Sequence, residues 1–109
     1  MKKTLITVLL VLISTIVHAG MIGFENLTVT KAGIDENGIA IIGLVTNDPN
    51  QDINPAKCSE PYYRFEGPGS KGALATAMSA LILDRTVDAW INTDKCPANT
   101  KQLHMIIMK

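Results

Sequence analysis

A single helical repeat interrupts a chain whose other regular segments have the pattern of β-strands. Residues 67–69 form a Gly/Pro break, and Ser70 after it is a natural N-cap for a helix that runs to about Asp84. Apolar side chains recur in this segment at helical spacing, at Leu74, Ala77, Met78, Leu81 and Ile82. Because no other segment has this period, the sequence predicts a mainly β fold with one α-helix.

The remaining regular segments are rich in β-branched residues or alternate apolar with polar residues. They are residues 24–31, 39–46, 61–66, 86–93 and 102–108. Leu27 and Val29 alternate with polar neighbours in the first segment. Asn37-Gly38 predicts a tight hairpin turn before the second segment. That second segment is apolar on both faces and is predicted to be central, with Gly43 marking a bulge or bend.

The order of these segments is three strands, one helix and two strands. This is the chain order of the oligonucleotide/oligosaccharide-binding (OB) fold, so we expect an OB-like barrel of five antiparallel strands with the helix between strands 3 and 4. Barrel closure would remove exposed strand edges, which an open sheet has to protect. An antiparallel sheet with one packed helix and no closure is the alternative.

Residues 1–19 have the pattern of a signal peptide. Lys2 and Lys3 precede an apolar stretch over residues 5–17, and Ala19 occupies the last position before a cleavage site. The stretch is too short for a comfortable bilayer span. We therefore expect a secreted or periplasmic protein, cleaved near Ala19, whose mature chain has no membrane span and forms one domain over residues 20–109. A retained N-terminal anchor is the alternative.

The charge balance of the predicted mature chain is mildly acidic. The full chain has ten basic and ten acidic residues, and losing Lys2 and Lys3 leaves eight basic residues against ten acidic ones. A protein that binds nucleic acid or an anionic membrane normally presents a basic surface. The sequence therefore argues against nucleic acid and against the membrane as partners.

The chain has two cysteines, Cys58 and Cys96, in polar segments that contain proline. In an oxidising compartment, an even pair in a small domain predicts one disulfide. No CxxC motif occurs, and the two cysteines with His104 are too few ligands for zinc. No metal and no cofactor is expected.

Catalytic residues are not evident in the sequence. His104 is the single histidine of the predicted mature chain, and it lies in a predicted strand between apolar residues. The carboxylate pairs Asp84 with Asp88 and Glu60 with Glu66 have the spacing of ordinary surface charges. We therefore predict a protein that is not an enzyme.

The polar loop after the second predicted strand has an oxygen-bearing side chain at alternate positions, as in the opening of a calcium loop. Ile53 and Ser59 then stand where a calcium loop needs Gly and Glu, which favours a solvated loop. Amides and carboxylates next to aromatic rings also suit a sugar, whose hydroxyls need partners and whose C–H face stacks on a ring. The predicted ligand-binding residues are Asp48, Asn50, Asp52, Tyr62, Tyr63 and Trp90. The alternative is that the aromatic residues are core.

The predicted helix has no charged residue between Lys71 and Asp84. We expect its large apolar residues to pack on the barrel and its other side to face outward. An outer helix face normally carries charged residues, whereas this one is small and weakly polar. Such a face suits another chain, so we predict an oligomer interface at Thr76, Ser79, Ala80 and Leu83. A tolerated surface of small residues is the alternative.

The run from Gly69 to Cys96, GSKGALATAMSALILDRTVDAWINTDKC, with Cys58 before it, resembles the B subunits of pertussis-like toxins, in particular the subtilase-cytotoxin branch. Val87 and Trp90 match positions of that family, and so do the two cysteines. The resemblance implies an OB-type barrel, a homo-oligomeric ring of five B subunits with helices lining a central pore, and glycan recognition on the outer surface. It also implies an exported enzymatic subunit as a partner, and it assigns no sugar-contacting residue to this chain.

The predicted function is therefore that of a secreted, carbohydrate-binding, ring-forming protein similar to a toxin B subunit. The alternative is a small periplasmic or secreted protein-interaction domain, such as an envelope protein or an inhibitor, without glycan binding.

Overall fold

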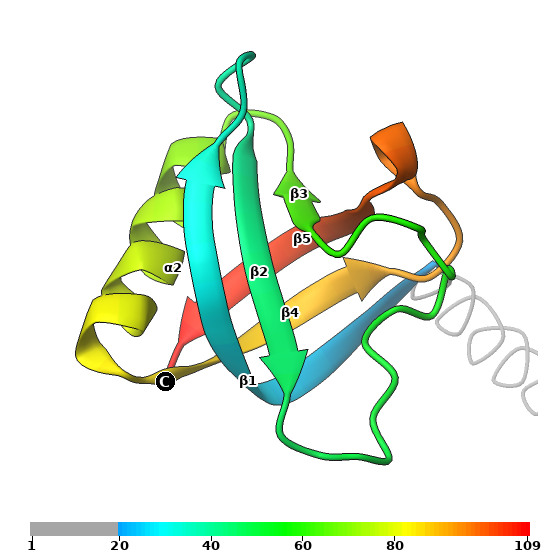
Figure 1. The fold of residues 1–109 in the computed structure, drawn as a ribbon, viewed down its shortest axis with the longest axis horizontal. Coiled ribbons are helices and arrows are strands. Elements are labelled where there is room, and N and C mark those ends of the chain that lie inside the picture. The colour runs from blue at the N-terminus through cyan, green and yellow to red at the C-terminus, as the bar shows by residue number, and fades with distance from the viewer. Residues whose placement is uncertain (1–19) are drawn as a thin grey trace, which may run out of the picture.

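Five strands and one α-helix make up most of residues 20–109, which are the residues that the computed structural model describes (Figure 1). The strands close into a barrel in the order β1-β2-β3-β5-β4. This confirms a mainly β fold with one α-helix and excludes the open sheet. The signal-peptide prediction concerns residues 1–19, outside the described residues. In chain order, the elements are β1 (Met21–Ile34), β2 (Ala40–Thr46), β3 (Tyr63–Phe65), α2 (Ser70–Leu83), β4 (Thr86–Asn92), the 3₁₀ turn η1 (Pro97–Asn99) and β5 (Lys101–Met108).

The barrel closes through a parallel pair, so the expectation of five antiparallel strands is wrong at one junction. Tyr63 of β3 lies opposite Lys101 of β5, and Arg64 lies opposite Gln102. The other strand pairs are antiparallel. The chain passes through α2 and β4 between these two strands, and parallel neighbours need a crossover of this kind. The sheet is therefore mixed.

β1 pairs with two strands because two bulges bend it. Its first part pairs with β4 and its second part pairs with β2. At the first bulge, Asn26 has a φ of 58°, in the left-handed region that Asn tolerates, and its N–H donates to Asp88 Oδ1 at 3.1 Å. The second bulge lies opposite Gly43 of β2, where a Cβ would collide with the Thr30 side chain. The distortion predicted at Gly43 thus lies in its partner strand.

The predicted hairpin turn between β1 and β2 is confirmed. Gly38 has a φ of 78°, and its N–H donates to the Asp35 carbonyl at 3.0 Å. Asp35 Oδ1 accepts the N–H groups of Asn37 and Ile39. A short Asp side chain that accepts from the following backbone is a common way to fix a turn.

The barrel interior is filled by alternate residues of the strands, as the period of two requires. Leu27 and Val29 are among them, as predicted. β2 has one inner and one outer face, because in a closed barrel every strand alternates between interior and exterior. Its outer residues include Val45, which is exposed, so the apolar outer face of this strand is not fully covered. The core cluster comprises Phe24, Leu27, Val29, Ile42, Leu44, Tyr63, Val87, Ala89, Ile91 and Leu103, together with three helix alanines.

α2 packs on the barrel through small residues, which reverses the predicted orientation of its large ones. Ser70, Ala73, Ala77 and Ala80 are its buried residues, and the helix lies mainly against β1 and β5. Small side chains let the helix approach the strands closely, whereas a stripe of Leu and Met would hold it away. Ala80 was predicted to face outward and is instead in the core at 1% exposure.

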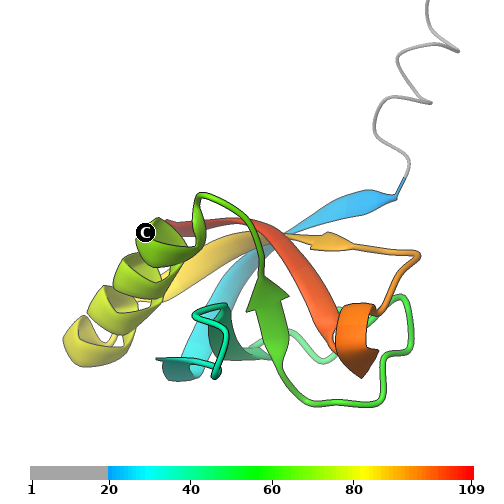
Figure 2. The ribbon, with the colours of Figure 1, turned by 90° about the horizontal axis from the view of Figure 1, so that it is seen from above.

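The start of α2 also differs from the sequence prediction. Ser70 is the first helical residue rather than the N-cap, which is Gly69 without a side-chain capping bond. Ser70 Oγ accepts the Ala40 N–H at 2.9 Å and so ties the helix to β2. Seen from above, α2 runs along one side of the barrel and η1 lies on the opposite side (Figure 2). No helix within residues 20–109 is long and apolar enough to span a membrane.

Candidate functional site

The predicted disulfide is present between Cys58 and Cys96. It joins the long β2–β3 connection to the segment that leads into η1. The bond fits an oxidising compartment. Its position means that the β2–β3 loop, which carries four of the six predicted ligand-binding residues, is held covalently to the segment before η1.

The β2–β3 loop is also ordered by its own side chains. Asp48 Oδ1 accepts the Asn50 N–H at 2.9 Å, and Asp52 Oδ1 accepts the Asn54 N–H at 2.9 Å. The hydrogen bond from Lys57, together with that N–H of Asn54, lowers the pKa of the Asp52 carboxyl. In the described part of the chain, no group of three or more His, Cys, Asp or Glu side chains is placed so that it could hold a metal ion. The alternating oxygens of this loop therefore serve local turns.

A polar hollow of about 430 Å³ lies between this loop and the first bulge of β1. Such a volume is within the range of small-molecule sites, which is about 300–1,000 Å³. Its shape depends on Asn47, whose Nδ2 donates to the Asn26 carbonyl at 2.8 Å and to Thr28 Oγ1 at 3.0 Å. Lys109 Nζ donates to Asn26 Oδ1 at 3.0 Å. The hollow is lined by Gly23, Glu25, Asn26, Asn47, Asp48 and Gln51.

Trp90 does not line this hollow, but it lies next to Gly23, which does. Gly23 lies opposite Trp90 in the β1–β4 pair, and a Cβ on Gly23 would lie 2.8 Å from the indole Nε1. Only a glycine therefore leaves room for the indole against the outside of β1. Trp90 is half-buried on the outer face of β4, so part of its side chain remains accessible.

Tyr63, by contrast, is structural, and its prediction as a ligand-binding residue is corrected. Its side chain is 1% exposed, and its hydroxyl donates to the Ile53 carbonyl at 2.7 Å. Burial raises the pKa of this hydroxyl, and the Asp52 charge adds to the effect. Lys101 Nζ lies 4.5 Å from the centre of the ring and donates to the Glu60 carbonyl at 3.0 Å. The ring therefore forms part of the barrel closure.

The other predicted residues are divided between the hollow and its surroundings. Asp48 lines the hollow, whereas Tyr62 is half-buried away from its lining, with Lys31 Nζ 5.1 Å from the centre of its ring. Asn50 and Asp52 are exposed in the same loop. The structure thus places Asp48 in the lining of the hollow and Trp90 next to the lining residue Gly23, and it leaves out both tyrosines.

Glu25, Asn26 and Gln51 were not predicted as site residues. Glu25 and Asn26 interrupt the apolar alternation between Phe24 and Leu27, and this is the sequence signal of the bulge that turns them toward the loop. Glu25 and Asp48 contribute carboxylate oxygens, which accept hydrogen bonds, and the amides both donate and accept. The arrangement suits a neutral ligand with several hydroxyl groups and one apolar face.

A second surface of interest is the outward side of α2, where large apolar side chains are exposed. The exposed fraction is 77% for Ile82, 58% for Leu83, 44% for Met78 and 43% for Leu81. Of the predicted interface residues, Leu83 is exposed, Thr76 and Ser79 are half-buried, and Ala80 is in the core. Beyond Lys71, the outer side of α2 is thus uncharged and largely apolar, through Leu83 as expected and through Met78, Leu81 and Ile82, which were expected to pack on the barrel.

The chain matches no protein-family model, no curated protein and no solved structure in the comparisons with known proteins.

Proposed function

We propose that this protein is a secreted, non-enzymatic OB-type domain that assembles into a homo-oligomeric ring through α2 and binds carbohydrate in the hollow beside Trp90. The OB assignment is supported by the closed five-stranded barrel with one helix on its outside. Secretion is supported by the signal-peptide pattern of the sequence and by the disulfide. The similarity to toxin B subunits, with an enzymatic partner subunit, rests on the sequence pattern alone.

The observation that carries carbohydrate binding is the position of the Trp90 indole next to Gly23, which lines the polar hollow. A sugar ring has an apolar C–H face that stacks on an indole, and a rim of hydroxyls that needs donors and acceptors. Glu25 of the β1 bulge and Asp48 and Gln51 of the β2–β3 loop supply these groups. The bulge at Asn26 and the disulfide-held loop fix the groups before a ligand arrives, which reduces the entropy cost of binding.

Carbohydrate binding is tested on a glycan array and then by titration with the glycan that gives the strongest signal. Asp48→Asn keeps the acceptor for the Asn50 N–H but removes the charge, and we expect at least tenfold weaker binding. Asp52→Asn is the matched control, because Asp52 lies in the same loop but outside the hollow. Wild-type binding no stronger than background across the array would overturn the proposal.

The alternative function, a protein-interaction domain without glycan binding, is favoured by one specific observation. The exposed apolar side of α2 suits a foreign protein as well as a second copy. Native mass measurement of the mature protein separates the two functions. A monomer at all accessible concentrations, with no glycan bound, would support this alternative and contradict the ring.

A further inference from the structure

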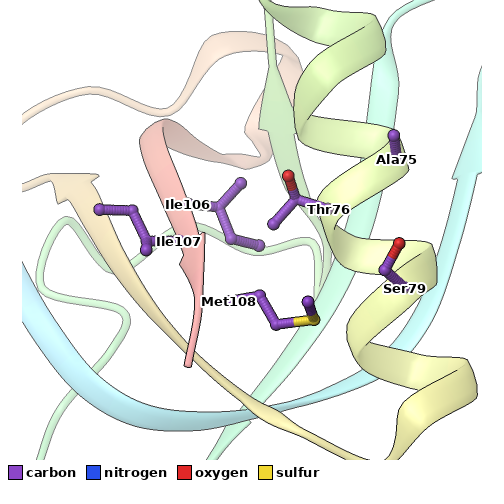
Figure 3. A pocket seen from close by; sticks show the side chains of 6 residues that line it. All are labelled: Ala75, Thr76, Ser79, Ile106, Ile107 and Met108. Atoms are coloured by element: carbon purple, nitrogen blue, oxygen red, sulfur yellow. The ribbon is translucent and has the colours of Figure 1, made fainter.

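The polar hollow beside the first bulge of β1 differs in charge from a second hollow between α2 and β5. The second hollow, of about 360 Å³, has no charged residue in its lining. Figure 3 shows Ile106 and Met108 directed toward the helix there, with Thr76 and Ser79 across from them. The lining of the polar hollow instead includes two carboxylates and no basic side chain. Of the two, the polar hollow is therefore the one in which the charge of a ligand affects its affinity.

The two carboxylates of the polar hollow belong to Glu25 and Asp48, and neither forms an ion pair within residues 20–109. Lys109 contacts the lining residue Asn26, but its ammonium already has two partners. Its Nζ donates to Asn26 Oδ1 at 3.0 Å and lies 3.8 Å from Asp88 Oδ1. The hollow thus carries two negative charges that no ion pair in the described part of the chain neutralises.

The unneutralised charges rank the ligands that this hollow can hold. A neutral sugar satisfies the hydrogen-bonding groups of the lining but leaves both carboxylates without a counter-ion. A sugar acid adds a third negative charge, which both carboxylates repel. A metal ion lacks ligands, because the described residues place no group of three or more metal-binding side chains together. An ammonium group on a sugar ring has three donors and forms charge-assisted hydrogen bonds, which are stronger than neutral ones.

The size of the hollow lets both carboxylates act on one ligand. A sphere with its volume of about 430 Å³ is about 9 Å across, which is close to the Debye length of about 8 Å in physiological salt. A positive charge inside the hollow is therefore only partly screened from either carboxylate. Opposite unit charges 4 Å apart in water attract by about a factor of five in the binding constant, so two carboxylates support a preference of at least about tenfold.

We infer that the carbohydrate recognised in the polar hollow is an amino sugar, whose protonated amino group is bound by Glu25 and Asp48. The inference rests on the proposed carbohydrate binding and adds the chemical class of the sugar. Glu25 comes from the β1 bulge and Asp48 from the β2–β3 loop, so the ammonium joins the two elements that frame the hollow. Neutral sugars bind in the same place more weakly, and sugars that carry a carboxylate are repelled.

Titration with three oligosaccharides of equal length tests this inference. They are oligomers of glucosamine, glucose and glucuronate, which differ in charge on similar rings. At about pH 6 the amine is protonated and the protein carboxylates are ionised. We expect wild type to bind the glucosamine oligomer at least tenfold more tightly than the glucose oligomer and not to bind the glucuronate oligomer measurably. Higher salt should reduce the difference between glucosamine and glucose, because it screens the carboxylates.

The double variant Glu25→Gln/Asp48→Asn removes both charges and keeps the shape of the side chains, so it should bind the glucosamine and glucose oligomers equally. Asp52→Asn is the matched control, because Asp52 lies in the same loop outside the lining, and it should keep the wild-type preference. The near-ultraviolet signal of Trp90 verifies that each variant is folded.

The outcomes separate this inference from carbohydrate binding itself. Equal wild-type affinities for the glucosamine and glucose oligomers would overturn the amino-sugar inference and leave carbohydrate binding intact, and so would a preference that persists in the double variant. A lysine oligomer that binds as tightly as the glucosamine oligomer would show selection for charge without a sugar ring, and it would overturn the inference as well. Binding of no oligosaccharide in the titrations or on the glycan array would overturn both proposals.

Discussion

The two sides of the barrel are covered in different ways. On one side, the β2–β3 loop is fixed by a disulfide, by side-chain hydrogen bonds to its own backbone, and by the Tyr63 hydroxyl (Figure 1). On the other side, α2 is held mainly by three buried alanines and the Ser70 hydroxyl, and its large apolar residues face away. The loop side satisfies its own polar groups, whereas the helix side leaves apolar surface uncovered.

This difference indicates that the two sides have different roles. A side that is complete within one chain can present rigid polar groups to a small ligand. A side that exposes Ile82 and Leu83 remains incomplete until another surface covers it. Four measurements test this distinction.

Removal of the disulfide should have the largest effect. The bond closes a loop across a sequence separation of 38 residues, so the Cys58→Ala/Cys96→Ala double variant should lower the free energy of unfolding by about 4 kcal/mol. Urea unfolding measures this, with reduced wild type as the control. A loss below about 1 kcal/mol would mean that the hydrogen bonds of the loop hold it without the covalent bond.

Enlarging the helix contact should come next. Ala77 is fully buried against the barrel, and Ala77→Leu should lower the free energy of unfolding by about 2 kcal/mol, because the added atoms push the helix away. Ala75→Leu is the matched control on the exposed side of the same helix, with an expected change within about 0.5 kcal/mol. Equal effects of both changes would contradict the orientation of α2.

Tyr63→Phe should cost about 1 kcal/mol at neutral pH, because the Ile53 carbonyl loses its donor. Burial raises the pKa of Tyr63 in the folded state, so above its ordinary value of 10.0 the unfolded chain loses this proton first. Wild-type stability should then fall by up to about 1.4 kcal/mol per pH unit from this residue.

Lys101 contributes with the opposite sign. Burial lowers the pKa of its ammonium, so its contribution to the free energy of unfolding increases as the pH rises to its ordinary pKa of 10.5. Urea midpoints measured between pH 9 and pH 12, a range that includes the ordinary tyrosine pKa of about 10, separate the contribution of Tyr63 from that of Lys101. Tyr63→Phe should lack the loss at the high end of this range. An identical alkaline profile in wild type and variant would show that the hydroxyl is not held protonated by the fold.

The smallest effect on stability is expected at Ile82. Its side chain is 77% exposed, so Ile82→Gln should change the free energy of unfolding by less than about 0.5 kcal/mol. Binding of a hydrophobic dye to the monomer should nevertheless decrease, because the variant removes part of the apolar surface. Val45→Gln on β2 is the comparison. A large loss of stability would place Ile82 in the core and remove the difference between the two sides.

Local patterns in the sequence predicted the elements and the disulfide. Leu27 and Val29 alternate inward as expected, and Asn37-Gly38 forms the expected turn. The helix orientation could not be obtained in this way, because periodicity reports which residues share a face but not which face meets the barrel. The alanines face inward because only small side chains fit the distance between α2 and the strands.

Only part of the candidate hollow was predicted from the sequence, and the reason is related. Asp48 and Trp90 are distinctive as residue types, but the register that brings Gly23 opposite Trp90 is a property of paired strands. Tyr63 has the residue type of a sugar-binding aromatic, yet its inward position follows from the parallel closure with β5. Pairings between distant segments therefore decide which of the candidate residues reach the site.

The disulfide and the parallel closure have the same spacing along the chain. Cys58 and Cys96 are separated by 38 residues, and so are Tyr63 and Lys101. Each strand begins five residues after its cysteine. The disulfide therefore joins the two segments at matching positions just before β3 and β5, although the contact between these strands extends over only two residue pairs. One residue inserted between Cys58 and Tyr63 would shift β3 by one position relative to the bond, and a one-residue shift turns inward side chains outward.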